Sequence, residues 1–202
     1  MIKLLMARHG LTDWNKDNRF QGQADIPLNQ TGVLQAQALG QMLSTELLDR
    51  IYVSTLARAG ETARAISAFH PCPVMVEPRL REICWGKWEG LTYDEIQRDY
   101  PEYLRTWETR DPEASSPGGE SITQLANRLQ PFLTDLAQEA DGKTVLVVSH
   151  GGVMQVMLCL LLGISPGLYW QFRISQASLS EVMYSPPERG VIYRLNETCH
   201  LS

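Results

Sequence analysis

The sequence predicts an α/β fold of three layers, in which a mostly parallel sheet lies between two layers of helices. Two short and almost uninterrupted apolar runs, at residues 2–7 and 145–148, are typical of strands buried on both faces of a parallel sheet. Helical patterns lie between the candidate strands, and this alternation indicates right-handed crossovers. A length of 202 residues suffices for one good core, so we expect a single domain over residues 1–202.

Shorter strands and a closing hairpin complete the predicted sheet. Residues 51–53 and 74–76 are weaker strand candidates than the two long runs. Near the end of the chain, residues 179–184 and 191–195 alternate in polarity on either side of a proline-containing turn at 185–190. This pattern predicts an antiparallel hairpin at the edge of the sheet.

Helix caps and apolar spacing predict the helices in the first half of the chain. Asn29 can cap a helix. Its apolar residues form two neighbouring stripes, one of Leu34, Ala38 and Met42 and one of Leu39, Leu43 and Leu47. A second helix is expected from about residue 57 to residue 69.

Two further helices are predicted in the second half. Ser121 and Gln124 fit a capping box, and the residues that follow share an apolar face of Ile122, Leu125, Leu129, Phe132 and Leu136. Pro131 lies inside this pattern and should bend or restart the helix. A last, buried helix should cover residues 152–162 and end at Gly163. The stretch 86–117 is rich in Trp, Tyr and charge, and we expect a helical, lid-like excursion there.

Composition excludes several classes of protein. Hydrophobic residues make up 44% and charged residues 20%, which rules out a disordered chain, a collagen-like fibre and a coiled coil. The net charge is −5, and the lack of basic excess argues against a nucleic-acid partner. The four cysteines form no C-x-x-C pair, and no apolar run is long enough for a signal h-region or a membrane span. We therefore expect a cytoplasmic protein without a membrane partner.

Two of the four histidines have the same context. His9 directly follows the first buried strand, and His150 directly follows the other. Ligands of open α/β sheets bind at the carboxyl ends of parallel strands, so both imidazoles should meet at one edge. Glycines after each histidine, Gly10 and Gly151, allow a ligand to approach the backbone. For His9 alone a structural, hydrogen-bonded role is the better explanation, but two histidines at matching strand ends, one of them beside an arginine, favour function.

Arginines near the same edge favour an anion as the ligand. Arg8 precedes His9, and Arg58 follows the strand candidate 51–53. A guanidinium pairs bidentately with phosphate oxygens. Metal binding is a weaker alternative, because no H-x-x-x-H or Asp-rich cluster accompanies the histidines and Arg8 would repel a cation.

Six motifs in order resemble the histidine phosphatase superfamily, also called the phosphoglycerate mutase-like fold. They are Arg8-His9-Gly10-Leu11-Thr12, Gln21-Gly22, the Ser54 to Ala59 segment around Arg58, Leu80-Arg81-Glu82, Pro117-Gly118-Gly119-Glu120-Ser121 and Val148-Ser149-His150-Gly151-Gly152. Each motif is weak alone. Their order and spacing extend over residues 2–201, which makes the resemblance specific.

The resemblance implies roles for individual residues. His9 would be the nucleophile that forms a phosphohistidine; Arg8, Arg58 and His150 would hold the phosphoryl oxygens; and Glu82 would protonate the leaving oxygen and then accept a proton from water. Substrate-binding roles would fall to Asn15, Gln21, Gly22, Trp85, Gly151 and His200. No cofactor and no metal ion is implied.

Three functions compete within this superfamily. The sequence has Gln21-Gly22-Gln23 and Ile83-Cys84-Trp85 where the mutases typically have Thr-Gly-Trp and Arg-His-Tyr, so we favour a phosphomonoesterase over a cofactor-dependent phosphoglycerate mutase. A non-enzymatic binding protein is disfavoured because no catalytic residue is missing. The tail 194–201 is similar to metal-independent phosphoserine phosphatases, which makes L-phosphoserine the expected substrate, with α-ribazole 5′-phosphate or a broad range of esters as the alternative. The partner would be a small phosphorylated metabolite, and related phosphatases often form homodimers.

Overall fold

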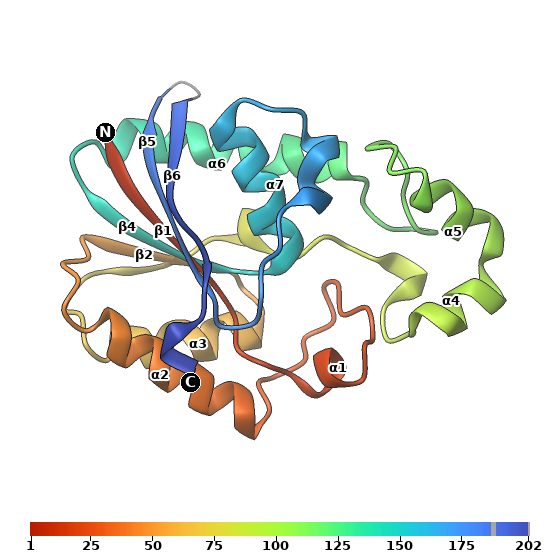
Figure 1. Cartoon of the computed structure of the whole chain (residues 1–202), viewed down its shortest axis with the longest axis horizontal. Coiled ribbons are helices and arrows are strands. Elements are labelled where there is room, and N and C mark those ends of the chain that lie inside the picture. The colour runs from red at the N-terminus through yellow and green to blue at the C-terminus, as the bar shows by residue number, and fades with distance from the viewer. Residues whose placement is uncertain (187–188, 202) are drawn as a thin grey trace.

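The computed structural model describes residues 1–186 and 189–201, and a mixed, mostly parallel sheet forms its centre (Figure 1). The strands lie in the order β3-β2-β4-β1-β5-β6. They are β1 (Ile2–Arg8), β2 (Arg50–Val53), β3 (Val74–Val76), β4 (Thr144–Ser149), β5 (Leu179–Ser185) and β6 (Arg189–Glu197). The predicted α/β class is confirmed, and all of the predicted strands form.

The four parallel strands bring their carboxyl ends to one edge. In the register of β1 and β4, Arg8 lies opposite Ser149, so the residues that follow these two positions emerge side by side. β2 pairs in parallel with β4, and Val53 lies opposite Val148. The hairpin of β5 and β6 is antiparallel and lies at the sheet edge, as predicted. Two residues of its predicted turn, Pro187 and Glu188, lie outside the described residues.

Helices cover both faces of the sheet, which gives the three predicted layers (Figure 1). α2 (Gln30–Leu43) and α3 (Ala57–Ser67) pack on one face over an apolar cluster that includes Leu5, Leu39 and Ile66. α6 (Ile122–Glu139) and α7 (Gly151–Leu162) pack on the other face, over a cluster that includes Met6, Leu129 and Met157. Alternate residues of β1 thus contribute to opposite cores, because successive side chains of a strand point to opposite faces.

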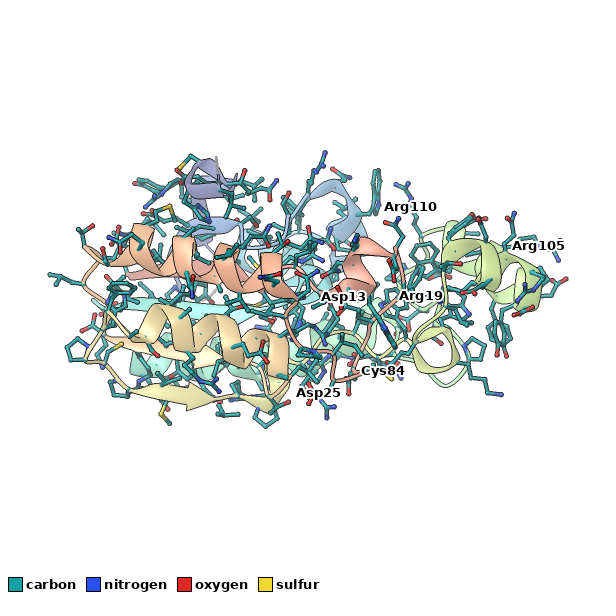
Figure 2. All side chains as sticks on the ribbon, turned by 90° about the horizontal axis from the view of Figure 1, so that it is seen from below. Asp13, Arg19, Asp25, Cys84, Arg105 and Arg110 are labelled. Atoms are coloured by element: carbon teal, nitrogen blue, oxygen red, sulfur yellow. The ribbon has the colours of Figure 1, made fainter. Side chains whose placement is uncertain are left out.

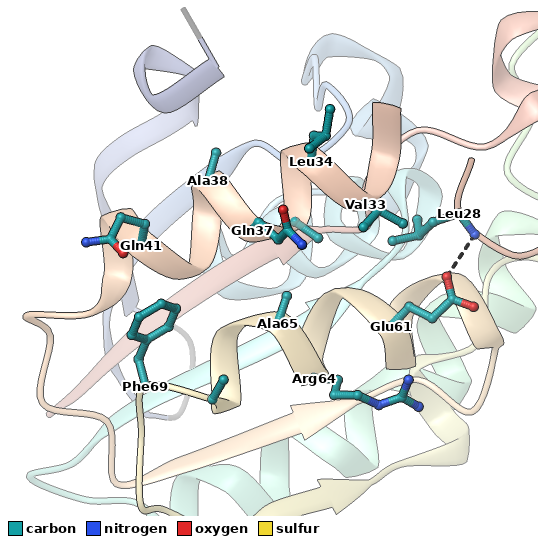
Figure 3. A pocket seen from close by; sticks show the side chains of 12 residues that line it. Leu28, Val33, Leu34, Gln37, Ala38, Gln41, Glu61, Arg64, Ala65 and Phe69 are labelled. Atoms are coloured by element: carbon teal, nitrogen blue, oxygen red, sulfur yellow. Dashed lines mark hydrogen bonds between the residues drawn. The ribbon is translucent and has the colours of Figure 1, made fainter. Parts of the chain in front are cut away.

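The buried face of α2 differs from the predicted stripes. Leu34 is 62% exposed and Leu47, beyond the helix end, is 87% exposed, so two of the predicted core residues lie in solvent. The buried face consists of Gly32, Ala36, Leu39, Gly40 and Leu43. Leu34 and Ala38 line an apolar groove between α2 and α3 instead, with a volume of about 880 Å³ (Figure 3). Small residues face inward here because α2 packs close to α3: a Cβ on Gly40 would lie 2.7 Å from the Ala65 carbonyl oxygen.

The predicted helix caps and helix ends agree closely with the structure. Asn29, Ser121 and the Ser121–Gln124 capping box cap α2 and α6 as expected. α6 continues through Pro131 without a restart, contrary to one of the two outcomes expected at that residue. α7 ends at Gly163, whose φ of 66° is the left-handed conformation that glycine favours at a helix end.

The excursion at residues 86–117 contains short helices at one end of the molecule (Figure 1). They are η2 (Gly86–Trp88), α4 (Tyr93–Asp99) and α5 (Pro101–Glu108). Trp88, Ile96 and Leu104 form a small apolar cluster of their own, and Trp85, Trp107 and Phe20 pack against it. The remaining short elements are α1 (Asp13–Lys16), η1 (Pro78–Leu80), η3 (Pro166–Gln171) and η4 (Cys199–Leu201). Among the described residues, no helix is both long and apolar enough to cross a membrane.

Candidate active site

A polar pocket of about 270 Å³ opens at the carboxyl edge of the parallel strands. Most of its lining comes from the segments that follow β1 and from the residues expected to act in catalysis. The lining residues are Arg8, His9, Asn15, Asn18, Arg19, Phe20, Gln21, Gly22, Arg58, Glu82 and Trp85. The strand-end argument therefore located the pocket correctly.

His9 follows β1 and is 2% exposed. Its Nδ1 lies 2.7 Å from the carbonyl oxygen of Gly10, which can only accept a hydrogen bond. The ring proton is therefore on Nδ1, and Nε2 carries a free lone pair. Gly10 is required at this turn, because a Cβ there would lie 2.4 Å from the carbonyl oxygen of Gly32 in α2.

Burial and charge keep this imidazole neutral. Burial, followed by the positive charges of Arg8 and Arg58, holds the pKa of His9 well below its usual range. A neutral imidazole with an unprotonated Nε2 is the form that a nucleophilic histidine needs.

His150 lies beside His9, as the two matching strand ends predict. It caps α7 directly after β4, and the two ring centroids are 5.1 Å apart. The Nε2 of His150 lies 2.8 Å from the Ser54 hydroxyl, while its buried Nδ1 has no hydrogen-bond partner. Burial is the main cause that holds the pKa of His150 well below its usual range, with Arg58 next. If the Ser54 hydroxyl donates to Nε2, the proton is on Nδ1, which is then able to donate to a ligand.

The two predicted arginines are cations that each keep an unused donor, and Arg58 is the more deeply buried of the two. Arg58 is fully buried and donates to the carbonyl oxygens of Gly22 and Ala24, at 2.7 and 2.8 Å. Arg8 donates to the Ile174 carbonyl oxygen at 2.6 Å. The Nε atoms of both arginines are buried and have no partner. Burial lowers the pKa of Arg58 to about 10 and also lowers the pKa of Arg8. A bound anion would offset the free-energy cost of burying these two positive charges.

Glu82 places its carboxylate against the first turn of α7. The backbone N–H groups of Gly152 and Val153 donate to Oε2 and Oε1 at 3.2 and 3.3 Å, and the N–H of Ile83 donates to Oε1 at 2.9 Å. The three N–H donors at this helix N-terminus fix the orientation of the Glu82 carboxyl group toward the pocket. Glu82 is the one carboxylate among the lining residues of the pocket.

Four predicted substrate-binding residues line the pocket, namely Asn15, Gln21, Gly22 and Trp85. The Oδ1 of Asn15 accepts from the backbone N–H of Thr12 at 3.2 Å, which leaves the amide NH₂ as its donor to a ligand. Gly22 has a φ of 51°, and a Cβ there would lie 2.2 Å from the Glu89 carboxylate. Trp85 stacks on Trp88 with ring centroids 6.0 Å apart.

The other two predicted substrate-binding residues do not line the pocket. Gly151 lies against Arg8, since a Cβ on it would be 3.3 Å from the Arg8 guanidinium carbon. His200 lies in η4, and its Nε2 is 2.9 Å from the carbonyl oxygen of Ala177. The N–H of Ala177 in turn donates to the His9 carbonyl oxygen at 3.0 Å, so His200 lies one residue removed from the His9 backbone.

Three lining residues were not predicted: Asn18, Arg19 and Phe20. Arg19 lies between the helices that cover the sheet and the α4–α5 segment (Figure 2), where it pairs with Glu95 of α4 at 3.1 Å and donates to the Gly90 carbonyl oxygen at 2.6 Å. Phe20 packs edge-on against Trp85 with ring centroids 5.3 Å apart. Their place just before Gln21-Gly22 was the available signal, because residues that flank a binding motif tend to share its surface.

The arrangement brings together a neutral imidazole, two guanidinium groups and a carboxyl group. Two arginines and His150 surround a neutral His9, and Glu82 is the carboxylate beside them. Such a site is able to bind a phosphoryl group, accept it on Nε2 and exchange a proton with the oxygen that leaves. Across residues 1–186 and 189–201, no group of three or more His, Cys, Asp and Glu side chains is arranged to hold a metal ion.

Comparisons with known proteins agree with this chemistry. The sequence model of the histidine phosphatase superfamily (branch 1) matches residues 4–198. Phosphoserine phosphatase 1 of Hydrogenobacter thermophilus is 39% identical over 201 residues, which are 100% of this chain and 95% of that protein. A probable phosphoglycerate mutase of Enterobacter sp. is 32% identical over 184 residues, which are 91% of this chain and 86% of that protein.

Solved structures show the same relationship. A putative α-ribazole-5′-P phosphatase of Escherichia coli superposes with a TM-score of 0.88 at 29% identity and covers 98% of both chains. A phosphoserine phosphatase mutant of Entamoeba histolytica, in complex with phosphoserine, superposes with a TM-score of 0.89 at 28% identity and covers 100% of both chains.

Proposed function

Since the chain belongs to branch 1 of the histidine phosphatase superfamily and is a phosphatase, we propose that it hydrolyses L-phosphoserine through a phosphohistidine on His9. The observation that carries the proposal is the buried set of donors around His9. Arg8, Arg58 and His150 each keep a buried nitrogen without a partner beside an imidazole whose Nε2 is free. A phosphoryl group supplies the oxygens that these nitrogens lack.

In the first half of the reaction, Nε2 of His9 attacks phosphorus and the bond from phosphorus to the ester oxygen breaks. Arg8, Arg58 and His150 hold the non-bridging oxygens, and the positive charge of the two arginines stabilises the transition state. Glu82, protonated at this stage, gives its proton to the leaving ester oxygen, which departs as an alcohol.

In the second half, water attacks the phosphorus of the phosphohistidine and the bond from phosphorus to nitrogen breaks. The Glu82 carboxylate accepts a proton from the water, so Glu82 and His9 return to their starting forms. Inorganic phosphate then leaves. The charge that the transferring phosphoryl group needs comes from the two arginines, and the proposed reaction therefore requires no metal ion.

Phosphoserine is favoured over larger esters by the relatives and by the size of the pocket. The relative at 39% identity is a phosphoserine phosphatase, and a pocket of about 270 Å³ suits a small ester. α-Ribazole 5′-phosphate is the second candidate, because Trp85 and Phe20 present aromatic surface at the pocket and an α-ribazole phosphatase shares the fold. The proposed partner is a small phosphorylated metabolite in either case.

A substrate panel tests the proposal. We expect kcat/KM for L-phosphoserine to exceed that for α-ribazole 5′-phosphate and 3-phosphoglycerate by at least about tenfold, and EDTA to leave the rate unchanged. Equal or better hydrolysis of another ester would overturn the substrate, and loss of activity in EDTA would overturn the metal-free mechanism. Phosphoglycerate isomerisation that depends on 2,3-bisphosphoglycerate would replace hydrolysis by a mutase reaction.

A further inference from the structure

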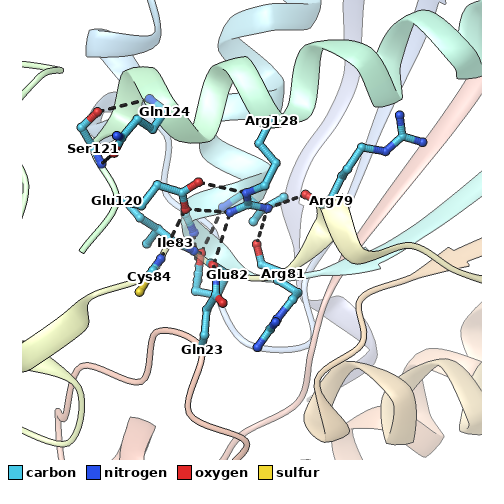
Figure 4. A network of polar contacts seen from close by, with 12 residues as sticks. Gln23, Arg79, Arg81, Glu82, Ile83, Cys84, Glu120, Ser121, Gln124 and Arg128 are labelled. Atoms are coloured by element: carbon cyan, nitrogen blue, oxygen red, sulfur yellow. Dashed lines mark hydrogen bonds and ion pairs between the residues drawn. The ribbon is translucent and has the colours of Figure 1, made fainter. Parts of the chain in front are cut away.

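Arg128 of α6 holds the backbone of the segment that carries Glu82, although it does not line the pocket (Figure 4). One of its terminal nitrogens donates to the carbonyl oxygens of Arg79 and Arg81, at 2.5 and 2.9 Å. The other terminal nitrogen lies 3.4 Å from the carbonyl oxygen of Glu82 itself. Three backbone carbonyls within four residues thus converge on one side chain.

Glu120 completes this arrangement from the residue just before the cap of α6. Its carboxylate accepts from Nε and a terminal nitrogen of Arg128 at 2.9 and 2.8 Å. The five contacts of Arg128 equal the five N–H donors of a guanidinium, so the side chain has one fixed orientation. Glu120 also joins the segment on the far side of Glu82: its Oε2 accepts from the Cys84 N–H at 3.3 Å, and its N–H donates to the Cys84 carbonyl oxygen at 2.8 Å.

Glu82 is therefore fixed from two directions. Arg128 and Glu120, which we call the Arg128–Glu120 clasp, hold the backbone on both sides of Glu82, and the first turn of α7 holds its carboxylate. Proton transfer needs the donor and acceptor oxygens within hydrogen-bond reach, and an error of about 1 Å is enough to slow an enzyme 10²-fold. Arg128 is less exposed than a surface arginine, at 22%, which fits a role in holding the backbone.

We propose that Arg128 and Glu120 are positioning residues that set the reach of the Glu82 carboxylate for proton transfer. This inference rests on the proposed phosphatase reaction and deepens it. It assigns the clasp to one step, the protonation of the leaving oxygen and the later deprotonation of water. Binding of the phosphoryl group by Arg8, Arg58 and His150 does not depend on the clasp, because these residues are held by other contacts.

The dependence of the rate on the leaving group separates this role from a general loss of structure. An alkyl phosphate such as L-phosphoserine needs a proton on its leaving oxygen, whereas 2,4-dinitrophenyl phosphate releases 2,4-dinitrophenolate, a stable anion that needs no proton. We expect Arg128→Gln to lower kcat/KM for the alkyl phosphate by about 10²-fold and for the activated aryl phosphate by less than about threefold. An equal loss for both esters would overturn the inference.

A double variant gives the second test. If Arg128 acts through Glu82, then Arg128→Gln should have little further effect on the rate in a variant that already lacks the Glu82 carboxyl group. Adding Arg128→Gln to Glu82→Gln should therefore change kcat/KM for the alkyl phosphate by less than about twofold. Losses that multiply would show that Arg128 acts independently of Glu82 and would overturn the inference.

Two further variants serve as control and reserve. Arg79→Gln removes the pairs of Arg79 with Glu77 and Asp135, in the same segment but without a contact to Glu82. We expect it to leave the ratio of the two rates within about twofold of wild type, and a change as large as that of Arg128→Gln would overturn the assignment.

Glu120→Gln is the reserve variant if Arg128→Gln does not fold, because it keeps the shape of the clasp. It should lower the rate for the alkyl phosphate more than the rate for the aryl phosphate, and an equal loss for both esters would overturn the inference. A wild-type chain that hydrolyses neither ester would instead overturn the proposed function.

Discussion

The pocket around His9 and the groove between α2 and α3 differ in size and in chemistry. The pocket has a volume of about 270 Å³ and is lined by the buried Arg58 and His9, the half-buried Arg8 and the carboxylate of Glu82. The groove has a volume of about 880 Å³, and its lining includes the exposed apolar side chains of Val33, Leu34 and Phe69. The smaller hollow carries the features of an active site, so uncompensated buried charge is the better guide to function here than volume.

The physical difference is electrostatic strain. In the pocket, burial lowers the pKa of Arg58 to about 10 and holds the pKa of His9 well below its usual range. Buried polar groups without partners cost free energy, and a fold keeps them where a ligand completes them. In the groove, by contrast, the carboxylate of Glu61 has a hydrogen-bond partner, because its Oε2 accepts from the Leu28 N–H at 3.1 Å (Figure 3). Substitutions in the pocket should therefore change the rate, the pH dependence of stability and phosphate binding, whereas substitutions in the groove should leave them nearly unchanged.

The largest effect is expected from removal of the nucleophile. His9→Ala should lower kcat by more than about 10³-fold, because the proposed phosphoenzyme cannot form, while the pocket keeps the arginines proposed to bind phosphate. Rapid-quench detection of ³²P on the protein measures the phosphoenzyme, and steady-state assays measure kcat. Retention of a tenth of the wild-type rate would remove His9 from the role of nucleophile.

The sequence located His9 and His150 because both lie at the ends of apolar strands, and strand ends follow from local patterns. It misplaced Leu34 because α2 carries apolar residues around much of its surface, and only the close packing on α3 decides which of them is buried. Arg128 had no signal, because a charged residue on an amphipathic helix usually faces solvent. The position of His200 could not be predicted for a related reason, because tertiary packing of η4 against α2 decides where the tail lies.

The lowered histidine pKa values should make the free energy of unfolding depend on pH. Burial depresses the pKa of His9 and His150 strongly, and it lowers the pKa of His70 and His200 as well. Below the ordinary pKa of histidine, near 6.5, the unfolded chain binds protons that the folded chain does not. Stability is therefore fully present above about pH 6.5 and is lost as pH falls below it, by up to about 1.4 kcal/mol per pH unit for each strongly depressed histidine.

Urea unfolding between pH 7 and pH 5 measures this slope. His150→Asn removes one of the two strongly depressed groups and should flatten the slope, whereas His70→Asn, with a less buried ring, should flatten it less. Equal slopes for wild type and His150→Asn would contradict the view that the pocket holds its histidines neutral.

The smallest effect is expected in the groove. Leu34→Gln and Phe69→Gln change side chains that are 62% and 44% exposed, so kcat/KM should stay within about twofold of wild type. Both variants should keep the stabilisation by inorganic phosphate, which reaches about 2.7 kcal/mol at a concentration of 100 Kd, because the proposed phosphate site lies at the arginines. Arg58→Met should abolish that stabilisation and is the matched contrast. If the groove variants lost the phosphate effect while Arg58→Met kept it, the two hollows would have exchanged roles, and buried charge would no longer mark the site.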